Sequence, residues 1–176
     1  MPDNVIIVGA GGHARVIADI VQCSGDSLLG FLDDDASIAS HAQPYLGRID
    51  QAYLYSSIAR FIIGIGNNSI RRRIAEYLGS KVDYYCAVHP SAVIAKGVSI
   101  CEGTVVMANV VLNPGVQISK HCIINTSCSI DHDSRVEDFA HISPGATIAG
   151  DVHVGQQTWV GAGAVIINGI TVCANS

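Results

Sequence analysis

A six-residue repeat fills the second half of the chain and restricts the folds open to it. All fourteen hexads from residue 91 carry Ile, Leu or Val at the fourth position: SAVIAK, GVSICE, GTVVMA, NVVLNP, GVQISK, HCIINT, SCSIDH, DSRVED, FAHISP, GATIAG, DVHVGQ, QTWVGA, GAVIIN and GITVCA. The second position is always small or aliphatic. Because residues two apart on a strand face the same side, these two positions line one interior. Each hexad is therefore predicted to form a short strand and a corner, and glycine opens six of them, where the chain must turn.

A single hexad cannot cover its own apolar side, so the repeat predicts stacked coils. Three hexads make one three-sided coil of 18 residues, and stacked coils enclose a continuous apolar core. The 84 residues of the repeat give about 4.7 coils. A sandwich of ordinary hairpins would need longer strands and less regular turns. Residues 18 apart are therefore expected to lie one above the other.

The first half of the chain alternates short apolar runs with helical periodicity. Strands are predicted over residues 5–8, 27–32 and 60–65, and helices over 14–23 and 69–78. Alternating strands and helices imply a small parallel sheet whose binding edge lies at the carboxyl ends of its strands. We expect two domains, an α/β domain before the repeat and an all-β domain containing it. The boundary is placed between residues 1–88 and residues 89–176.

Candidate phosphate contacts follow these strands. The segment GAGGHA, residues 9–14, fits a loose form of the dinucleotide-binding pattern, with Asp33 and Asp34 about twenty residues further on. Free N–H groups at a helix N-terminus attract phosphate. The spacing does not distinguish a nicotinamide cofactor, another nucleotide and a plain tight turn. The arginines at residues 71–73 could also meet phosphate, although such a run is more typical of a solvated helix face.

His132 is the candidate catalytic group of the repeat. It closes the hexad SCSIDH at a corner, between Asp131 and Asp133. A carboxylate beside an imidazole raises its basicity and fixes its tautomer, which suits a general base near neutral pH. A solvated polar corner would show the same pattern. Gly150 lies 18 residues further on and is expected beside His132, with room for a substrate and a backbone N–H for a developing oxyanion.

Charge and composition disfavour several classes of partner. The net charge is −5 and only 14% of residues are charged, which disfavours nucleic acid and anionic membranes. The N-terminus meets glycine and charge too early for a signal peptide, and no long apolar run suggests a membrane span, so a cytoplasmic protein is expected. The six cysteines form no CxxC pair and are expected to be reduced packing residues.

The chain contains seven histidines, which are common zinc ligands. No two histidines of the repeat lie 18 apart, and there is no HxxxH or HxxxxH pair, so none are expected to stack within one chain. We therefore predict no metal within a single chain. A site shared between subunits stays open.

The motifs VGAGGHA, FLDDD, IIGIGNNSIRRRI, IDHD, HISPGATIAG and VGAGAVI together resemble those of the sugar acetyltransferases of the PglD/NeuD type, over nearly the whole chain. The resemblance implies a Rossmann-like domain followed by a left-handed parallel β-helix. It further implies acetyl-CoA as cosubstrate, no metal, and a homotrimer with active sites between neighbouring subunits. Members of the family run further, so it also implies that a C-terminal coil is missing beyond Ser176.

The resemblance also implies roles for individual residues. It places the catalytic base at His132 and its supporting carboxylate at Asp133. Implied acetyl-CoA contacts are His141, Gly150 and Ala162, and implied nucleotide-sugar contacts are Gly11, Gly12, His13, Asp33, Asp34 and Gly66. The implied reaction is direct acetyl transfer to the amine of a nucleotide-linked amino sugar. Three alternatives stay open here: O-acetylation of a sialic acid or related sugar, a noncatalytic nucleotide-sugar-binding protein, and a metal-dependent enzyme.

Overall fold

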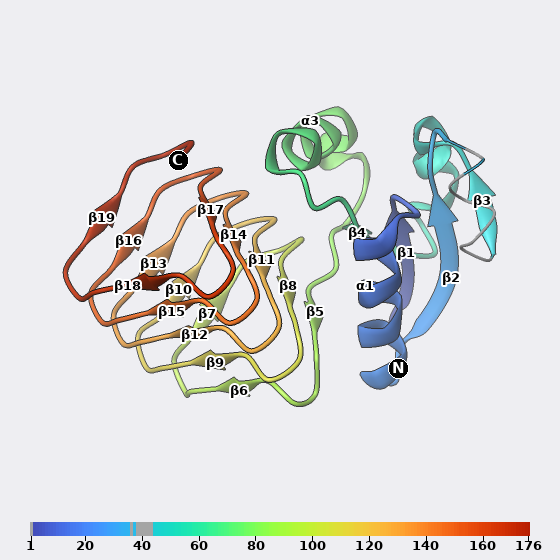
Figure 1. The fold of residues 1–176 in the computed structure, drawn as a ribbon. Coiled ribbons are helices and arrows are strands. Elements are labelled where there is room, and N and C mark those ends of the chain that lie inside the picture. Colours follow the sequence, from blue (N-terminus) through green and yellow to red (C-terminus); the bar gives the residue numbers. More distant parts are fainter. Residues whose placement is uncertain (1, 36, 38–43) are drawn as a thin grey trace.

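The computed structural model describes residues 2–35, 37 and 44–176 and shows an α/β domain beside a three-sided column of stacked coils (Figure 1). The α/β domain contains one parallel sheet with the strand order β3-β2-β1-β4. Its strands are β1 (Asn4–Val8), β2 (Ser27–Leu32), β3 (Tyr45–Gly47) and β4 (Arg60–Ile63). Its helices are α1 (Gly12–Cys23), α3 (Asn68–Leu78) and the 3-10 helices η1 (Ile49–Tyr55) and η2 (Gly79–Lys81).

Helices α1 and α3 cover opposite faces of this sheet. Val5 and Ile7 of β1 pack with the apolar side of α1, whereas Ile6 and Val8 pack with that of α3. The expected strands and helices are present, although β4 ends two residues earlier than residue 65. The sequence pattern does not predict β3, which is only three residues long and pairs with β2 through an irregular register.

The strand order creates a binding crevice at one edge of the sheet. From β1 the sheet extends through β2 to β3 on one side, whereas β4 lies on the other side of β1. Ligands of open α/β sheets bind at such a reversal, outside the carboxyl ends of the strands. The glycine loop after β1 and the segment Gly64–Asn67 after β4 both lie here. An added Cβ at Gly64 would meet Ala14 Cβ at 2.8 Å, so glycine is needed for α1 to approach β4.

The rest of the chain forms three five-stranded parallel sheets, which we call the first, second and third faces. The first face contains β5 (Ala87–Val88), β8 (Val105–Val106), β11 (Ile123–Ile124), β14 (His141–Ile142) and β17 (Trp159–Val160). The second contains β6 (Val93–Ile94), β9 (Val111–Leu112), β12 (Ser129–Ile130), β15 (Thr147–Ile148) and β18 (Val165–Ile166). The third contains β7 (Ser99–Ile100), β10 (Gln117–Ile118), β13 (Arg135–Val136), β16 (His153–Val154) and β19 (Thr171–Val172).

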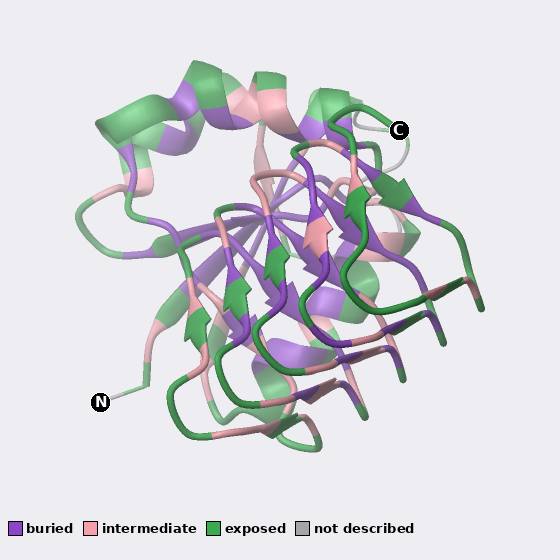
Figure 2. Ribbon diagram, turned by 90° about the vertical axis from the view of Figure 1, so that its left-hand side faces the viewer, coloured by how far each residue is buried: buried purple, intermediate pink, exposed green. Residues whose placement is uncertain are grey.

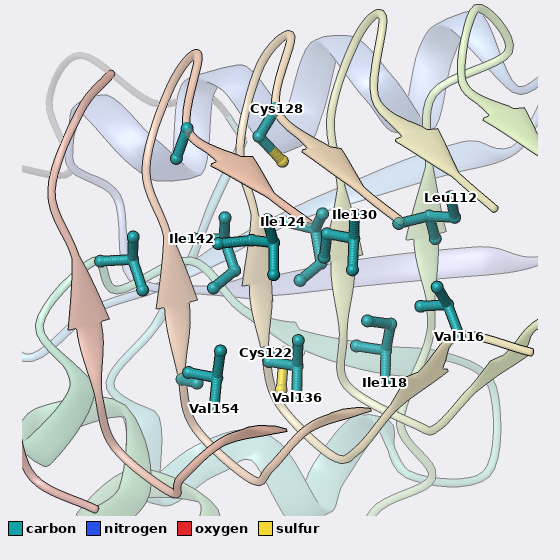
Figure 3. Packing of buried hydrophobic residues seen from close by; sticks show 14 of the residues in the cluster. Leu112, Val116, Ile118, Cys122, Ile124, Cys128, Ile130, Val136, Ile142 and Val154 are labelled. Atoms are coloured by element: carbon teal, nitrogen blue, oxygen red, sulfur yellow. The ribbon is translucent and has the colours of Figure 1, made fainter. Parts of the chain in front are cut away.

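The coil spacing expected from the repeat is confirmed by strand register. Ile118 pairs with Val136 on the third face, and Ile130 pairs with Ile148 on the second, in each case 18 residues apart. The fourth hexad position points inward and forms the core together with the second position, as the close-up of the packing shows (Figure 3). On the second and third faces the outward residue of each short strand is exposed or half-buried, whereas both residues of β8, β11 and β14 on the first face are buried (Figure 2).

The corners share one backbone conformation. The first position of every hexad from residue 97 to residue 175 has a positive φ. Six of these positions are glycine, as the sequence suggests, but eight carry side chains: Asn109, His121, Ser127, Asp133, Phe139, Asp151, Gln157 and Asn175. A non-glycine residue in the left-handed region costs roughly 1–2 kcal/mol. The stacked coils therefore impose the turn even where the residue does not favour it.

Helix α1 lies between the α/β sheet and the first face. Its buried residues Ala14 and Ile17 belong to one apolar cluster with Val105 and Ile123, which point outward from the first face. The two domains therefore share a core, and the α/β domain covers the first face of the column.

The cysteines only partly follow the expectation. All six are free, and Cys122 and Cys128 are buried in the column core. Cys23, Cys101 and Cys173 are exposed, so the prediction that all six are packing residues is wrong for these three. Among the described residues, no helix combines the length and apolar character needed to cross a bilayer.

Candidate active site

His132 lies at the corner between β12 of the second face and β13 of the third. Its Nδ1 is 2.9 Å from Asp133 Oδ2, and its side chain is 59% exposed. The hydrogen bond to Asp133, helped by the charge of Asp131, raises the pKa of His132 above its ordinary value. Asp131 Oδ1 accepts from the His132 backbone N–H at 2.8 Å and from Asn113 Nδ2 at 2.8 Å, which fixes this corner. The imidazole is thus oriented through Nδ1, leaving Nε2 for a substrate.

Gly150 lies directly beside the ring of His132. A Cβ built on Gly150 would lie 2.6 Å from His132 Nε2 and 2.8 Å from Cε1. The expected neighbourhood of residues 132 and 150 is therefore confirmed. Only glycine leaves the Nε2 side of the imidazole open at this corner.

His141 lies on the first face, under the α/β domain. It is 7% exposed and its ring stacks on Trp159, with centroids 5.1 Å apart. Burial, together with the charge of Arg71, lowers the pKa of His141 to about 4. His13, in the first turn of α1, also has its pKa lowered to about 4 by burial and by the charges of Arg71 and His141. Both imidazoles are therefore neutral near pH 7.

The tautomer of His141 follows from its neighbour Asn125. Asn125 Oδ1 accepts from the Thr126 backbone N–H at 2.8 Å, so its Nδ2 faces His141 Nε2 at 3.0 Å and donates to it. His141 Nε2 is therefore the acceptor, and Nδ1 carries the proton. Within the described part of the chain, Nδ1 of His141 and Nε2 of His13 are buried without a hydrogen-bond partner. His121 Nδ1 is in the same state. Buried polar groups are rarely left unpaired, so each of these atoms has room for one further hydrogen bond.

The acidic pair after β2 has two different environments. Asp33 Oδ2 accepts from the Ala10 backbone N–H at 2.8 Å and so fastens the glycine loop, which contains Gly11 and Gly12. Asp34 is half exposed and accepts from the Ile49 backbone N–H at 3.1 Å. Asp33 and Asp34 line a cavity of about 570 Å³ with Arg73 and residues of η1 and α3. This cavity lies at the carboxyl edge of the sheet, where a nucleotide is expected.

Within one chain, the expected site residues lie at three separate places. His132, Asp133 and Gly150 lie at the corner between the second and third faces, whereas His141 lies on the first face with His13. In a three-sided coil, a corner is opposite the face that it does not touch. The predicted base and the α/β domain are therefore on opposite sides of one column. Ala162 is exposed at a third place, the corner between β17 and β18.

Similar proteins have the same two-domain architecture. Residues 4–78 match the PglD N-terminal domain family. A solved structure of a perosamine N-acetyltransferase variant from Caulobacter crescentus, in complex with CoA and GDP-perosamine, is 31% identical with a TM-score of 0.92, covering 98% of this chain and 83% of that one. The present chain belongs to the PglD-type sugar N-acetyltransferases. Its fold is accordingly a Rossmann-like domain followed by a left-handed parallel β-helix, as expected.

Two further relatives of this PglD-type chain have related names. The acetyltransferase domain of PglB from Neisseria gonorrhoeae, solved with acetyl coenzyme A, is 30% identical with a TM-score of 0.84, covering 99% of this chain and 89% of that one. A UDP-N-acetylbacillosamine N-acetyltransferase from Bacillus subtilis is 37% identical over 111 residues. That match covers 60% of this chain and about half, 51%, of the Bacillus protein.

One group of side chains in this PglD-type protein could hold a metal ion. Ligand atoms of Asp19, Cys23 and His89 lie within 4.8 Å of one another, between α1 and the corner after β5. His89 Nδ1, however, accepts from the Ser91 backbone N–H at 3.0 Å. A neutral imidazole that accepts at Nδ1 carries its proton on Nε2 and has no lone pair left for a metal there. We therefore assign no metal role to this group.

Sequence reasoning missed three residues around His141. Asn125 fixes its tautomer, and Trp159, whose Nε1 donates to Ser143 Oγ at 2.8 Å, stacks on its ring. The position of Trp159, 18 residues after His141, is a signal that the coil spacing already contained. Arg71 is 1% exposed, so the expectation of a solvated helix face is wrong for this arginine. No periodicity of α3 could show this, because the groups that bury Arg71 come from the column.

Replacing Asp133 with asparagine is expected to shift the pH dependence of acetyl transfer. The aspartate raises the pKa of His132, and the base must be neutral to accept a proton, so activity falls as the pH drops through that pKa. Loss of the carboxylate charge lowers the pKa, and the acidic limb of kcat/KM moves to lower pH. The pH-independent value of kcat/KM should also fall by about tenfold, because the imidazole loses a charged hydrogen-bond partner. Rate measurements from pH 5 to 9 check this, with Glu137→Gln, which alters the carboxylate beside His153, as the control. An unshifted limb would contradict the assigned pair.

Proposed function

We propose that this chain transfers the acetyl group of acetyl-CoA to the amine of a nucleotide-linked amino sugar, with His132 as general base. The observation that carries the proposal is the corner itself, where His132 is oriented by Asp133 and its Nε2 side is kept open by Gly150. The names of the relatives support an amine acceptor, since the Caulobacter enzyme is a perosamine N-acetyltransferase bound to CoA and GDP-perosamine.

The reaction needs no covalent enzyme intermediate. The sugar amine attacks the thioester carbonyl carbon, and His132 Nε2 takes the proton that the nitrogen loses as the C–N bond forms. The C–S bond then breaks, and the CoA thiolate leaves and takes up the proton from the imidazolium. A backbone N–H at Gly150 is our candidate donor to the tetrahedral oxyanion. A raised His132 pKa makes the ring a stronger base for the amine proton.

His141 is proposed as a neutral hydrogen-bond donor to acetyl-CoA. Its Nδ1 carries a proton, lies buried and lacks a partner among the described residues. Its low pKa keeps the second proton off the ring at neutral pH, so the donor brings no charge to the site. Such a group suits a carbonyl or amide oxygen of the cosubstrate. Ala162, exposed at the corner between β17 and β18, is proposed as a separate acetyl-CoA contact.

The nucleotide sugar is proposed to bind at the carboxyl edge of the α/β sheet. Gly11, Gly12 and His13 would face the phosphates, and Gly66 would line the crevice after β4. Asp34 borders the neighbouring cavity, whereas Asp33 acts mainly by fastening the glycine loop. We therefore treat Asp33 as a residue that shapes the nucleotide site.

A homotrimer completes this site. The base and the nucleotide crevice are on opposite sides of one column, so His132 of one subunit must work on a sugar held by the α/β domain of a neighbour. Cyclic symmetry repeats such a head-to-tail contact until the ring closes. We further propose that the reaction takes place in the cytoplasm, which agrees with six free thiols.

Release of free thiol from acetyl-CoA tests the proposed function. With GDP- or UDP-linked 4-amino sugars as acceptors, we expect thiol release to depend on the sugar amine, because only that group attacks the thioester. The matched control is the same nucleotide sugar with a hydroxyl at the reacting carbon. Release with the hydroxyl sugar alone would point to O-acetylation, and no release with any acceptor would overturn an acetyltransferase.

A further inference from the structure

Arg71 of α3 is buried at the junction of the two domains, with all of its N–H groups paired. It is 1% exposed, and burial lowers its pKa to about 10. None of its hydrogen-bond partners in the described chain is a carboxylate. Its acceptors are His121 O at 2.8 Å, Ile65 O at 3.0 Å, Gly66 O at 3.1 Å, Asn68 Oδ1 at 2.9 Å and Phe139 O at 2.8 Å. The guanidinium therefore joins the loop after β4 to two corners of the column.

Asn68 extends this contact to a third corner. Its Nδ2 donates to Gln157 O at 2.9 Å and Thr158 O at 3.3 Å, while its Oδ1 accepts from Arg71. Residues 121, 139 and 157 are 18 apart, so the first turn of α3 holds the same corner of three successive coils. Adjacent hydrogen-bonded strands are about 4.8 Å apart. A slip of the helix by one coil would therefore move the attached loop by about 4.8 Å.

The corners held by Arg71 carry bulky residues in a costly conformation. His121 and Phe139 have φ values of 54° and 60°, and their rings stack with centroids 5.1 Å apart. Side chains in the left-handed region cost of order 1–3 kcal/mol and persist where the surroundings hold them. The stacked coils impose this turn at every corner. At these two corners the guanidinium binds both carbonyl groups and so fixes where they point.

The contact of Arg71 with the column lies at the same axial level as the proposed base, His132. His132 and Phe139 belong to the same coil, on either side of β13, and Arg71 holds that corner together with the one below it. The other end of the guanidinium binds the carbonyl of Gly66, in the proposed nucleotide crevice. The Arg71 side chain thus fixes the loop proposed to face the nucleotide sugar at a defined level along the column.

We infer that Arg71, assisted by Asn68, is a positioning residue that sets the axial register of the nucleotide-binding domain on the column. This inference rests on the proposed function, in which the domain presents the sugar amine to His132 of a neighbouring subunit. In a ring of parallel columns the subunits have equal heights, so the register within one chain also determines the register between chains. The reacting amine then arrives opposite Nε2 and not one coil above or below it.

Arg71→Lys and Asn68→Ala test the inference, with Arg72→Lys as the matched control. Lysine keeps the charge but offers three donors from one atom in place of the planar fork. A misplacement of about 1 Å costs about 100-fold in rate, so kcat should fall by about 10- to 100-fold in Arg71→Lys, with a higher KM for the nucleotide sugar. Asn68→Ala should change both in the same direction and by less. Arg72 forms an exposed ion pair with Glu76 at 2.7 Å, and its variant should behave as wild type.

Two further readouts separate positioning from simple stabilisation. The acidic limb of the pH profile should stay in place, because His132 is untouched, and hydrogen exchange of the amides at residues 64–68 should rise while the column core stays protected. If the variants only lower the melting temperature, with KM and local exchange unchanged, the inference is overturned. If Arg71→Lys does not fold, Asn68→Ala decides by the same criteria. If wild type acetylates no sugar, the proposed function fails, while the exchange experiment still tests the register.

Discussion

Replacing His132 with alanine is expected to lower kcat by about two to four orders of magnitude, the range that general base catalysis contributes. The side chain is 59% exposed and packs against no core residue, so the fold and its unfolding temperature should stay unchanged. His153→Ala is the matched control, because His153 also pairs with a carboxylate, Glu137, at 2.8 Å, but on the third face. A wild-type rate in His132→Ala would remove this residue from the mechanism.

The same variant tests whether the site is shared between subunits. His132→Ala and His141→Ala are each expected to lose activity, but they alter groups on opposite sides of the column. When equal amounts are unfolded, mixed and reassembled, about a quarter of the subunit contacts in a ring combine an intact His132 with an intact His141. Recovered activity near a quarter of wild type is therefore expected. No recovery from mixed rings would place both histidines in a site within one chain.

Replacing Gly150 with alanine is expected to lower kcat by about 100-fold with little change in stability. The new methyl group would lie 2.6 Å from His132 Nε2, so the exposed ring must swing away from the position in which it accepts the amine proton. A displacement of about 1 Å at the reacting atom is enough for an effect of this size. Steady-state kinetics with the nucleotide sugar measures the loss, and the acidic limb set by His132 should also shift, since the contact to Asp133 is disturbed.

Gly161→Ala is the control for the thermal effect of a methyl group at a corner. An added Cβ at Gly161 meets nothing within 4 Å, so both alanine variants should melt close to wild type. If Gly150→Ala keeps full activity, the open side of the imidazole is not where the substrate binds. If it loses activity only through a collapse in melting temperature, the methyl group disturbs the column and not the chemistry.

The column was predictable because its pattern is local and repeated. Each hexad specifies its inward residues without reference to the other domain, and the 18-residue spacing brings His132 to Gly150 by counting alone. The left-handed conformation of the corners was predictable only in part. Six glycines indicate it, but residues such as His121 and Phe139 adopt it as well. There the stacked backbone decides, against the preference of the residue.

The junction between the domains was not predictable in the same way. Arg71 occupies a polar run on α3, and only the carbonyl groups of His121 and Phe139, 50 and 68 residues away, make its burial possible. The separation of His132 from His141 was likewise hidden, although they are only nine residues apart. Half a coil of chain takes the backbone from a corner to the opposite face, so closeness in sequence becomes distance in space.

The register of the column also limits how its length can vary. A single hexad inserted between residues 132 and 150 would rotate everything after it by one face. Gly150 would then leave its place beside His132. A whole extra coil between them would keep Gly150 at the same corner but move it by about 4.8 Å along the column axis. The corners at residues 121, 139 and 157 impose the same restriction through α3. Natural lengthening or shortening is thus compatible with this geometry only outside residues 121–157.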